Sequence, residues 1–373
     1  MGISQKILFI YRKLVENLYT KPKNVIKLFK QKELYNSISY FPERPSRPVW
    51  KNYLFQIGQI LKYSIPNVFY FMYGLDVKTD EERNEYVNYK PFMDRRNFLN
   101  YGNNQHNSTC ILRNKLYFDI FAKSIGINVP QIKAYYSQGQ LFIWKNGFKK
   151  AVFSDLSDWD DINLFCKEIE GECGIGIFIL SIVGGKLFVQ NEEITAEEFQ
   201  MRIKGADYLF QEIIEQHPEM SKLYSGSINT MRLVTVRSLK DHKLHILPSI
   251  LRIGANGSFV DNTSQGGIAV GFDLETGQLH QYGFYKPQFG LKTELHPNSG
   301  IRLSDFSIPM IKEAEQMALH FHSMLKDIHS IGWDIAIGPD GPIFIEGNDN
   351  WEINGPQVGN HGFRKEFLEY FFD

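Results

Sequence analysis

Residues 332–348 read Gly-Trp-Asp-Ile-Ala-Ile-Gly-Pro-Asp-Gly-Pro-Ile-Phe-Ile-Glu-Gly-Asn, which is the most informative segment of the chain. Two β-rich runs flank a central Pro-Asp-Gly turn signal, which predicts a β-hairpin. A three-residue loop at this turn sets Asp334 directly opposite Glu346, with Cβ atoms roughly 5 Å apart. Asn348 lies two positions after Glu346 and therefore projects from the same face of the hairpin.

These three oxygen-bearing side chains predict a metal site. Two carboxylates held so close repel each other unless a cation joins them. Hard oxygen ligands supplied by few protein donors suit Mg²⁺ (or Mn²⁺), which also takes phosphate oxygens. Asp334, Glu346 and Asn348 are therefore the candidate metal ligands of a metal–nucleotide site.

The alternative interpretation is that this Asp and Glu are solvated surface residues, which is the usual state of such side chains. Four isoleucines oppose that interpretation, because the alternation predicts that all of them share the opposite face. They are Ile335, Ile337, Ile343 and Ile345. A hairpin with one apolar face is at least half-buried, so the metal interpretation is favoured.

Bulk properties describe a chain of 373 residues, enough for two or three packed units. It contains no apolar run of about 18 residues, so no transmembrane helix is predicted. Charged residues interrupt the apolar positions near residue 1, which argues against a signal peptide. Three cysteines without a Cys-x-x-Cys pattern favour the cytoplasm and argue against structural zinc.

The charge is unevenly distributed. Residues 1–66 contain twelve basic and three acidic residues, a net charge of +9 in a chain whose net charge is −1. Apolar residues recur at helical spacing among the basic ones over residues 3–19. This pattern predicts docking on a polyanion or on an anionic membrane surface, at the inner face of the membrane. The alternative is a helix packed on the main body with its lysines in water. No nucleic-acid partner is expected, and the oligomeric state stays open.

A second motif surrounds Lys167. A predicted strand delivers this lysine to a loop that contains Gly171, Gly174 and Gly176, and another strand follows. Glycines let backbone N–H groups approach phosphate closely, and a lysine adds positive charge. The glycine spacing and the missing Gly-Lys-Ser/Thr exclude a Walker loop and a dinucleotide fingerprint. The alternative is an ordinary glycine-rich turn between strands.

A third motif is the strand end Gln211-Glu212-Ile213-Ile214. An apolar strand that ends in this way offers backbone groups to a purine and a carboxylate to a ribose. Taken alone, it is equally an ordinary strand end. The motif gains meaning only beside the lysine loop and the metal hairpin.

Together these segments resemble the ATP-grasp superfamily over roughly residues 110–360. Lys115, which opens a predicted helix, and Lys167 resemble its phosphate-binding lysines, and residues 211–214 resemble its adenine hinge. Arg232 resembles its phosphate- and acyl-contacting arginine, and the metal triad matches in order and spacing. Several short segments resemble the branch called sugar-transfer-associated ATP-grasp: Asn229-Thr230-Met231-Arg232, Asp261-Asn262, Gly266-Gly267, His296-Pro297 and Gly332-Trp333-Asp334.

The resemblance implies an α+β fold in which two subdomains grip ATP between antiparallel sheets. We expect a basic, largely helical N-terminal region over residues 1–108. A lid subdomain is expected over 109–212, and a C-terminal subdomain with the metal and acceptor sites over 213–373.

The resemblance also implies an ADP-forming ligase in which ATP activates a carboxylate as an acyl phosphate and an amine then attacks. Lys167 and Arg232 are the implied catalytic residues. Other implied nucleotide contacts are Lys115, Gly171, Gly174, Gly176, Gln211, Glu212, Ile213 and Ile214. The implied substrate contacts are Asn229, Asn262, Ser264, Gly266 and Gly267. In spacing, the chain resembles the ligases that add glutamate to a ribosomal protein. Those ligases carry an arginine near the position of Gln265, and its replacement by glutamine argues against an acidic, glutamate-like substrate.

Three functions are compatible with these features. The first is a carboxylate–amine ligase that modifies a surface polysaccharide or a glycan precursor, as the name of the branch suggests. The second is a ligase that adds amino acids to a peptide or a protein tail. The third is a docking protein that binds ATP without catalysis, which the complete triad and both lysines argue against.

Overall fold

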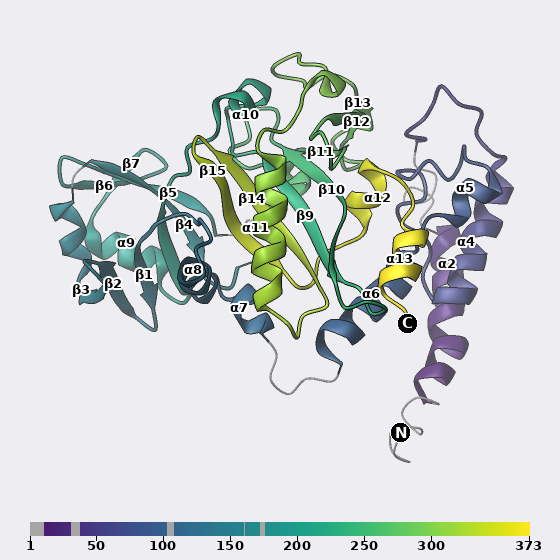
Figure 1. The fold of residues 1–373 in the computed structure, drawn as a ribbon, viewed down its shortest axis with the longest axis horizontal. Helices are drawn as coiled ribbons and strands as arrows, with labels where there is room; N and C mark the ends of the chain where they lie inside the picture. The colour runs from purple at the N-terminus through teal and green to yellow at the C-terminus, as the bar shows by residue number, and fades with distance from the viewer. Residues whose placement is uncertain (1–10, 31–37, 103–107, 160, 172–175) are drawn as a thin grey trace.

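The computed structural model describes residues 11–30, 38–102, 108–159, 161–171 and 176–373. Within these ranges the chain has the predicted α+β fold, built on two separate antiparallel sheets (Figure 1). The predicted helical N-terminal region is present and lies beside the second sheet. No helix in the described ranges is both long and apolar enough to cross a membrane.

Eight strands form the first sheet: β1 (Ile132–Ser137), β2 (Gln140–Trp144), β3 (Phe148–Ala151), β4 (Ile162–Glu168), β5 (Phe178–Val183), β6 (Lys186–Val189), β7 (Glu192–Ile194) and β8 (Tyr208–Glu212). Their order is β3-β2-β1-β8-β4-β5-β6-β7. Helix α9 (Ala196–Ile203) packs its fully buried Phe199 against Phe178 and Phe210 of this sheet. The alternating apolar side chains of the strands thus bury one face under α9.

Seven strands form the second sheet: β9 (Thr230–Arg237), β10 (Leu244–Ile253), β11 (Ile268–Phe272), β12 (Leu279–Phe284), β13 (Lys292–Thr293), β14 (Ser330–Gly338) and β15 (Gly341–Asn348). Their order is β13-β12-β11-β10-β9-β14-β15. Helix α11 (Ile311–Met324) covers one face, where Phe321 lies 4.7 Å from the ring of Trp333. The other face carries a second buried apolar cluster, which includes Val234 and Val236 of β9, and the polar side chains of the cleft described below.

The hairpin β14–β15 places Asp334 directly opposite Glu346, as predicted, but by a different route. Gly338 pairs with Gly341, so the connecting turn is two residues long instead of three. Ile345 is then an extra, unpaired residue in a β-bulge of β15. This extra residue shifts the register by one position and brings Glu346 opposite Asp334.

The prediction that Ile343 and Ile345 share the face opposite to the carboxylates is wrong. Phe344, not Ile345, pairs with Ile335 and is fully buried in the core, and Ile343 pairs with Ala336 instead of Ile337. Ile345 instead lines the cleft described below. One inserted residue reverses the side-chain alternation of a strand, and simple alternation in the sequence does not reveal it.

The N-terminal region contains a π-helical turn η1 (Glu16–Thr20) and helices α2 (Lys21–Lys30), α4 (Val49–Tyr63), α5 (Asp80–Asn84) and α6 (Tyr89–Tyr101). Short helices connect the remaining elements: α7 (Thr109–Arg113), α8 (Lys115–Ser124), η2 (Phe153–Asp158), α10 (Pro218–Leu223), η3 (Thr263–Gln265), η4 (Leu303–Asp305), α12 (Asn354–Gly359) and α13 (Arg364–Tyr370).

Helix α6 is bound to the second sheet through Asn100, whose side chain is buried. Its amide donates to the carbonyl oxygens of Ser330 (3.1 Å) and Asp349 (2.7 Å). Its oxygen accepts from the backbone N–H groups of His329 (3.1 Å) and Ser330 (3.2 Å). These contacts cross the domain boundary predicted at residue 108, and the boundaries themselves stay predictions.

We expect Asn100→Ala to lower the free energy of unfolding by about 2–4 kcal/mol, because it leaves buried backbone groups without partners. Denaturant unfolding followed by circular dichroism measures this loss. Asn163→Ala, at an exposed position of β4, is the control and should change stability by less than about 0.5 kcal/mol. Equal stabilities of the two variants would contradict the structural role of Asn100.

Candidate functional site

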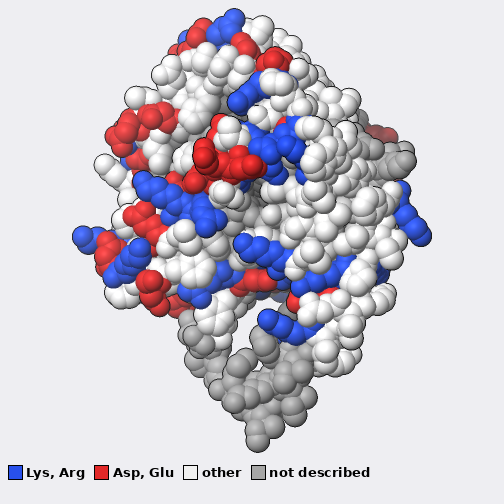
Figure 2. Space-filling model, turned by 90° about the vertical axis from the view of Figure 1, so that its right-hand side faces the viewer, with Lys and Arg blue, Asp and Glu red and all other residues white. Residues whose placement is uncertain are grey.

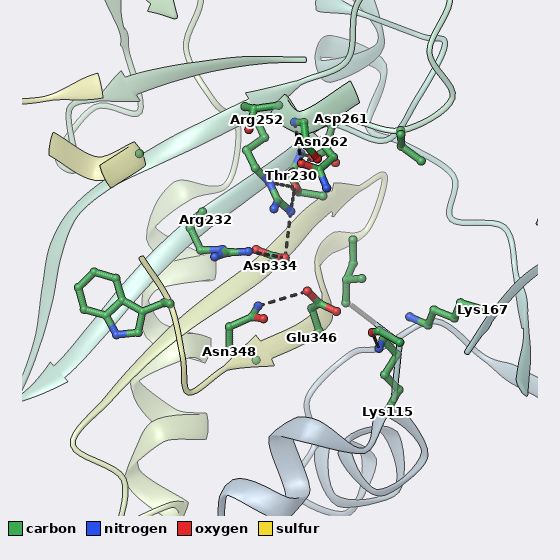
Figure 3. Close-up of a pocket in the computed structure, with 18 of the residues that line it drawn as sticks. Lys115, Lys167, Thr230, Arg232, Arg252, Asp261, Asn262, Asp334, Glu346 and Asn348 are labelled. Carbon is green, nitrogen blue, oxygen red and sulfur yellow. Dashed lines mark hydrogen bonds and ion pairs between the residues drawn. The ribbon is translucent and has the colours of Figure 1, made fainter. Parts of the chain in front are cut away.

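A cleft of about 1360 Å³ is lined by both sheets and holds most of the predicted site residues (Figure 3). The first sheet and α8 contribute the two lysines, and the second sheet contributes the carboxylates and arginines. The predicted residues in its wall are Lys115, Lys167, Gly171, Gln211, Glu212, Ile213, Ile214, Arg232, Asn262, Ser264, Asp334, Glu346 and Asn348. Segments far apart in the sequence thus meet in one cavity.

Asp334 and Glu346 face each other on neighbouring strands, and Asn348 Nδ2 donates to Glu346 Oε1 at 3.2 Å. Burial raises the pKa of Glu346, and the negative charge of Asp334 adds to this effect. Burial also disfavours the charged form of Asp334, but Arg232 and Arg252 outweigh it and hold the pKa of Asp334 below its usual range. Glu346 is therefore a half-buried carboxylate whose charge lacks full compensation.

This donor set fits a magnesium ion. Two carboxylates and an amide oxygen are hard ligands, and they leave coordination positions for phosphate oxygens. A cation there would relieve the repulsion that raises the pKa of Glu346. Across the described ranges, no group of three or more His, Cys, Asp or Glu side chains is placed to hold a metal. The triad, with its amide as the third ligand, remains the candidate for this role.

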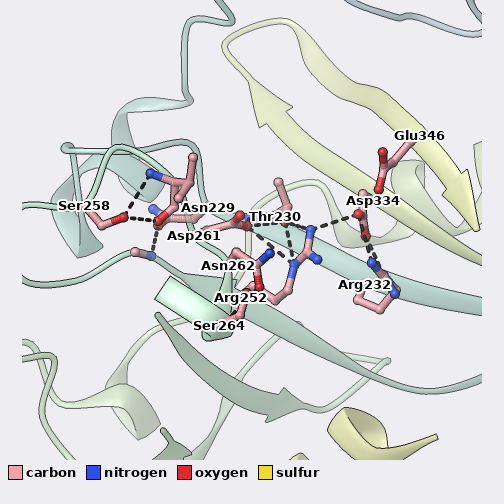
Figure 4. A network of polar contacts seen from close by, with 12 residues as sticks. Asn229, Thr230, Arg232, Arg252, Ser258, Asp261, Asn262, Ser264, Asp334 and Glu346 are labelled. Carbon is pink, nitrogen blue, oxygen red and sulfur yellow. Dashed lines mark hydrogen bonds and ion pairs between the residues drawn. The ribbon is translucent and has the colours of Figure 1, made fainter. Parts of the chain in front are cut away.

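Two arginines bracket Asp334 (Figure 4). Arg232 lies directly opposite it on β9 and donates from Nη2 to Asp334 Oδ2 at 3.0 Å. Arg252, on β10, forms an ion pair with Asp334 at 2.9 Å and a longer one with Asp261 at 3.6 Å. It also donates to Thr230 Oγ1 through two nitrogens. Asp334 therefore faces two guanidinium groups where one was predicted.

Arg252 escaped the sequence analysis because it stands alone in an apolar run. The one available signal is geometric. Arg252 pairs with Thr230, and Arg232 lies two positions after Thr230 on the same strand, so all three side chains share one face of the sheet. This pairing joins two strands whose register the local sequence does not reveal.

The two lysines approach the cleft from the first sheet and α8 (Figure 3). Asn114 caps α8 by accepting two backbone N–H groups, which places Lys115 at the start of the helix. Lys115 Nζ donates to the carbonyl oxygen of Gly171 at 2.5 Å. Lys167 is only 5% exposed, and this burial lowers its pKa to about 8 despite the opposing attraction of Glu346. An anionic group in the cleft would offset the lost hydration of Lys167.

We expect Lys167→Ala to weaken ATP binding by roughly 10- to 100-fold, the usual worth of a hydrogen bond to a charged group. Isothermal titration calorimetry measures the dissociation constant. Lys150→Ala, at an exposed position of β3 in the same sheet, is the matched control and should leave it unchanged. Unchanged affinity in Lys167→Ala would reject a phosphate contact.

The lowered pKa of Lys167 also predicts a pH dependence. Above about pH 8 the free protein carries a neutral Lys167, so binding of an anionic phosphate requires the uptake of a proton. We expect the ATP dissociation constant to rise by up to about tenfold per pH unit above this value. Lys167→Arg, which stays charged, should remove that rise in the same titrations. A rise of equal size in both proteins would assign the pH dependence to another group.

Residues 211–214 leave β8 at the edge of the cleft. Gln211 is buried, whereas the apolar side chain of Ile213 is 47% exposed and lines the cavity. Glu212 is held by an ion pair with Lys133 at 2.5 Å, and its N–H donates to the carbonyl oxygen of Gln131. An exposed apolar side chain beside ordered polar groups offers a surface for a flat base. The role of residues 211–214 as an adenine hinge stays a prediction.

The predicted acceptor loop is only partly in the cleft wall. Asn262 and Ser264 line the cavity, whereas Gly266 and Gly267 do not. A Cβ atom on Gly267 would lie 2.3 Å from the carbonyl oxygen of Asp261, and Gly266 has a positive φ of 95°. The two glycines therefore allow the tight path of the loop instead of lining the site.

The predicted substrate contact of Asn229 is corrected to a structural role. Its side chain is completely buried outside the cleft wall. Nδ2 donates to the carbonyl oxygens of Met220 and Tyr224, and Oδ1 accepts from the N–H of Gly254. With these bonds made, Asn229 connects the end of helix α10 to Gly254, which follows β10.

The glycines of the lysine loop differ in their placement. Gly171 lines the cleft. Gly176 does not, and its φ of 73° is a backbone conformation that favours glycine. Gly174 lies outside the described residues, so its predicted phosphate contact stays a prediction.

Comparison with solved structures gives neighbours of low identity. One is N5-carboxyaminoimidazole ribonucleotide synthetase from Thermotoga maritima, with 14% identity, a TM-score of 0.34 and coverage of 64% of this chain and 42% of that one. D-alanyl-alanine synthetase A from Vibrio cholerae O1 biovar eltor has 12% identity, a TM-score of 0.36 and coverages of 64% and 55%. D-Alanine-D-Alanine ligase from Helicobacter pylori has 12% identity, a TM-score of 0.38 and coverages of 69% and 59%. This chain thus spans 42–59% of the length of these three proteins.

A search of curated proteins finds no match. The family model described as sugar-transfer associated ATP-grasp matches residues 94–369, from within α6 to within α13. The match includes both sheets and all the residues discussed for the cleft, and it leaves residues 1–93 outside. The chain belongs to the sugar-transfer associated ATP-grasp family.

Proposed function

We propose that this protein is an ATP-dependent ligase that joins a carboxylate to an amine through an acyl phosphate. One arrangement carries the proposal: two lysines face a carboxylate pair and two arginines within a single cleft. A polyphosphate needs cations along its length, and a metal needs carboxylates beside them. The cleft supplies both kinds of group.

The reaction requires two displacements. A carboxylate oxygen of the first substrate attacks the γ-phosphorus of ATP, the bond to the β-phosphate oxygen breaks and ADP leaves. The amine nitrogen of the second substrate then attacks the carbonyl carbon of the acyl phosphate. The carbon–oxygen bond to phosphate breaks, the amine proton passes to a base and inorganic phosphate leaves.

The side chains of the cleft position the reactants and stabilise charge. Lys115 and Lys167 hold phosphate oxygens, and residues 211–214 receive the adenine. Arg232, with Arg252 beside it, stabilises negative charge on the acyl phosphate, because a guanidinium donates to paired oxygens. Mg²⁺ (or Mn²⁺) bound by the triad would supply neutralisation of the phosphate charge.

Polar and aromatic side chains in the cleft wall support a sugar-like substrate. Asn262, Ser264, Lys286 and Glu352 supply polar groups there, and Phe69 supplies an aromatic surface from the N-terminal region. Hydroxyl-rich rings need many hydrogen-bonding partners beside an apolar surface. We therefore propose a glycan precursor, modified in the cytoplasm where ATP is available, as one substrate.

The test is release of ADP in the presence of magnesium, with uronic acids and amino acids supplied singly and in pairs. We expect turnover that requires a sugar acid or an amino sugar, and capture of the acyl phosphate by hydroxylamine as a hydroxamate. Formation of AMP would contradict the mechanism. Turnover only with peptides would indicate a peptide substrate instead of a glycan precursor. Tight ATP binding without turnover on any pair of substrates would indicate a non-catalytic protein.

A further inference from the structure

A helical segment over residues 11–30 carries apolar side chains that the rest of the protein does not cover. In its first half, Leu14 is 52% exposed and Leu18 is 76% exposed. Tyr11 and Tyr19 are similarly exposed. A helix that buries so little apolar surface gains little stability from packing, so a partner surface is needed to cover it.

Helix α4 adds a second exposed stripe beside the first. Trp50, Leu54 and Leu61 are each 58–59% exposed. Their spacing of four and seven residues sets them on one face of the helix, whereas the buried Gln56 and Ile60 lie elsewhere on its circumference. The exposed apolar side chains of α4 therefore form one continuous stripe along the helix.

The two helices are held together as one unit. Asn24 Nδ2 of α2 donates to the carbonyl oxygen of Ser64 at 2.7 Å, just after the end of α4. Phe29 stacks on Tyr53 with ring centroids 5.2 Å apart. The exposed stripes thus belong to one surface, which we name the N-terminal helical face and define as residues 11–30 and 49–63.

This face is strongly basic. Residues 11–30 and 49–63 contain eight basic side chains and a single acidic one, Glu16, a net charge of +7. Figure 2 looks onto this side of the molecule and shows blue groups among white ones over its right half, whereas red groups lie mainly toward the left. The lysines lie among the apolar side chains: Lys23 is over the ring of Tyr19, and Lys51 is over that of Trp50.

Exposed Leu, Trp and Tyr side chains among lysines are the composition of a helix that lies in the headgroup region of an anionic bilayer. A second copy of the chain is disfavoured, because a two-fold contact through this face would place +7 against +7. Nucleic acid is disfavoured as well, because its phosphate backbone offers nothing to bury exposed leucines. Charge and apolarity together specify a lipid surface.

We propose that the N-terminal helical face docks this protein on a bilayer that contains anionic lipid. The apolar side chains enter the headgroup region, and the lysines pair with lipid phosphates. Docking does not depend on the proposed ligase reaction, since none of the residues of this face lines the cleft.

Sedimentation of the full chain with vesicles tests the proposal. We expect the protein to sediment with vesicles of phosphatidylcholine and phosphatidylglycerol and to stay in solution with phosphatidylcholine alone. Lys23→Glu with Lys27→Glu should weaken partitioning by at least about 25-fold, since each basic residue near the surface contributes about fivefold. Leu14→Ser with Leu18→Ser should weaken it separately, because these leucines supply buried apolar area.

Matched controls lie on the first sheet and its helix. Lys150→Glu and Met201→Ser alter an exposed lysine and an exposed apolar residue, and both should sediment like the unchanged protein. Equal sedimentation with both vesicle types, or none with either, would overturn the proposal. A dimer that forms without vesicles and is lost in the Leu14→Ser, Leu18→Ser variant would assign the face to a second copy instead.

Tryptophan fluorescence gives an independent readout. We expect anionic vesicles to shift the emission to shorter wavelength as Trp50 leaves water. Trp50→Phe should abolish the shift, whereas Trp144→Phe, which removes another exposed tryptophan on β2, should keep it. A shift that survives in Trp50→Phe would contradict the proposed orientation.

Discussion

Glu346→Gln is expected to reduce ADP-forming turnover by roughly 10²- to 10³-fold, the loss typical of removing one preorganised electrostatic contact. Glutamine keeps the shape of the side chain but removes the charge that a bound cation requires. The measurement is the rate of ADP release with saturating ATP and the acceptor pair identified in the screen. Glu313→Gln, at an exposed position of α11, is the control and should keep the rate of the unchanged protein.

Stability separates this effect from misfolding. Burial and Asp334 raise the pKa of Glu346, so its charge is disfavoured in the metal-free fold. Removing that charge should leave the metal-free protein at least as stable as before, and added magnesium should no longer raise the melting temperature. Full turnover in Glu346→Gln would contradict the assignment of Glu346 as a metal ligand. Continued stabilisation by magnesium would place the ion at another site.

Arg232→Ala is expected to lower turnover by roughly 10²-fold while changing ATP affinity by less than about threefold. The proposed partner of Arg232 is charge that develops on the acyl phosphate, and an interaction made only there appears in kcat. Folding should persist, because Asp334 keeps its ion pair with Arg252 at 2.9 Å. Single-turnover rates and nucleotide titrations measure the two quantities.

Two further variants sharpen this prediction. Arg232→Lys keeps the charge but loses the paired donors, so it should recover only part of the rate. Arg302→Ala removes an exposed arginine whose partner is Glu294, at 2.8 Å, and should not change either quantity. Loss of ATP affinity in proportion to turnover would reassign Arg232 to ground-state phosphate binding.

The local sequence was sufficient to predict the hairpin at the centre of the site, whereas the fold class came from the family resemblance. Hairpin pairing depends on a short turn and on alternation, so the opposition of Asp334 and Glu346 was visible in residues 332–348. The turn at Gly184-Gly185, where both φ angles are positive, is equally local. The helix that begins at Lys115 follows from the cap at Asn114, an interaction within one turn.

Resemblance extended the prediction to residues whose meeting has no local signal. Lys115, Lys167 and residues 211–214 line one cleft with the metal triad, as their order in the family implied. Their chemical roles stay predictions until the variants are measured. The pairing of Asp334 with Glu346 was predicted correctly from an incorrect turn. The turn is one residue shorter than predicted and the bulge at Ile345 adds one residue, so the two differences cancel.

Residues close in the chain thus predicted the hairpin that carries the triad and the basic, apolar character of the N-terminal helices, and the family resemblance supplied the α+β class. Packing alone brings Arg252 to Asp334, engages Asn229 with α10 and with Gly254, and binds Asn100 to the second sheet. The difference lies in separation along the chain. Turns, caps and alternation act between neighbours in the chain, whereas these contacts arise only after distant strands and helices have packed and excluded water from the polar groups between them.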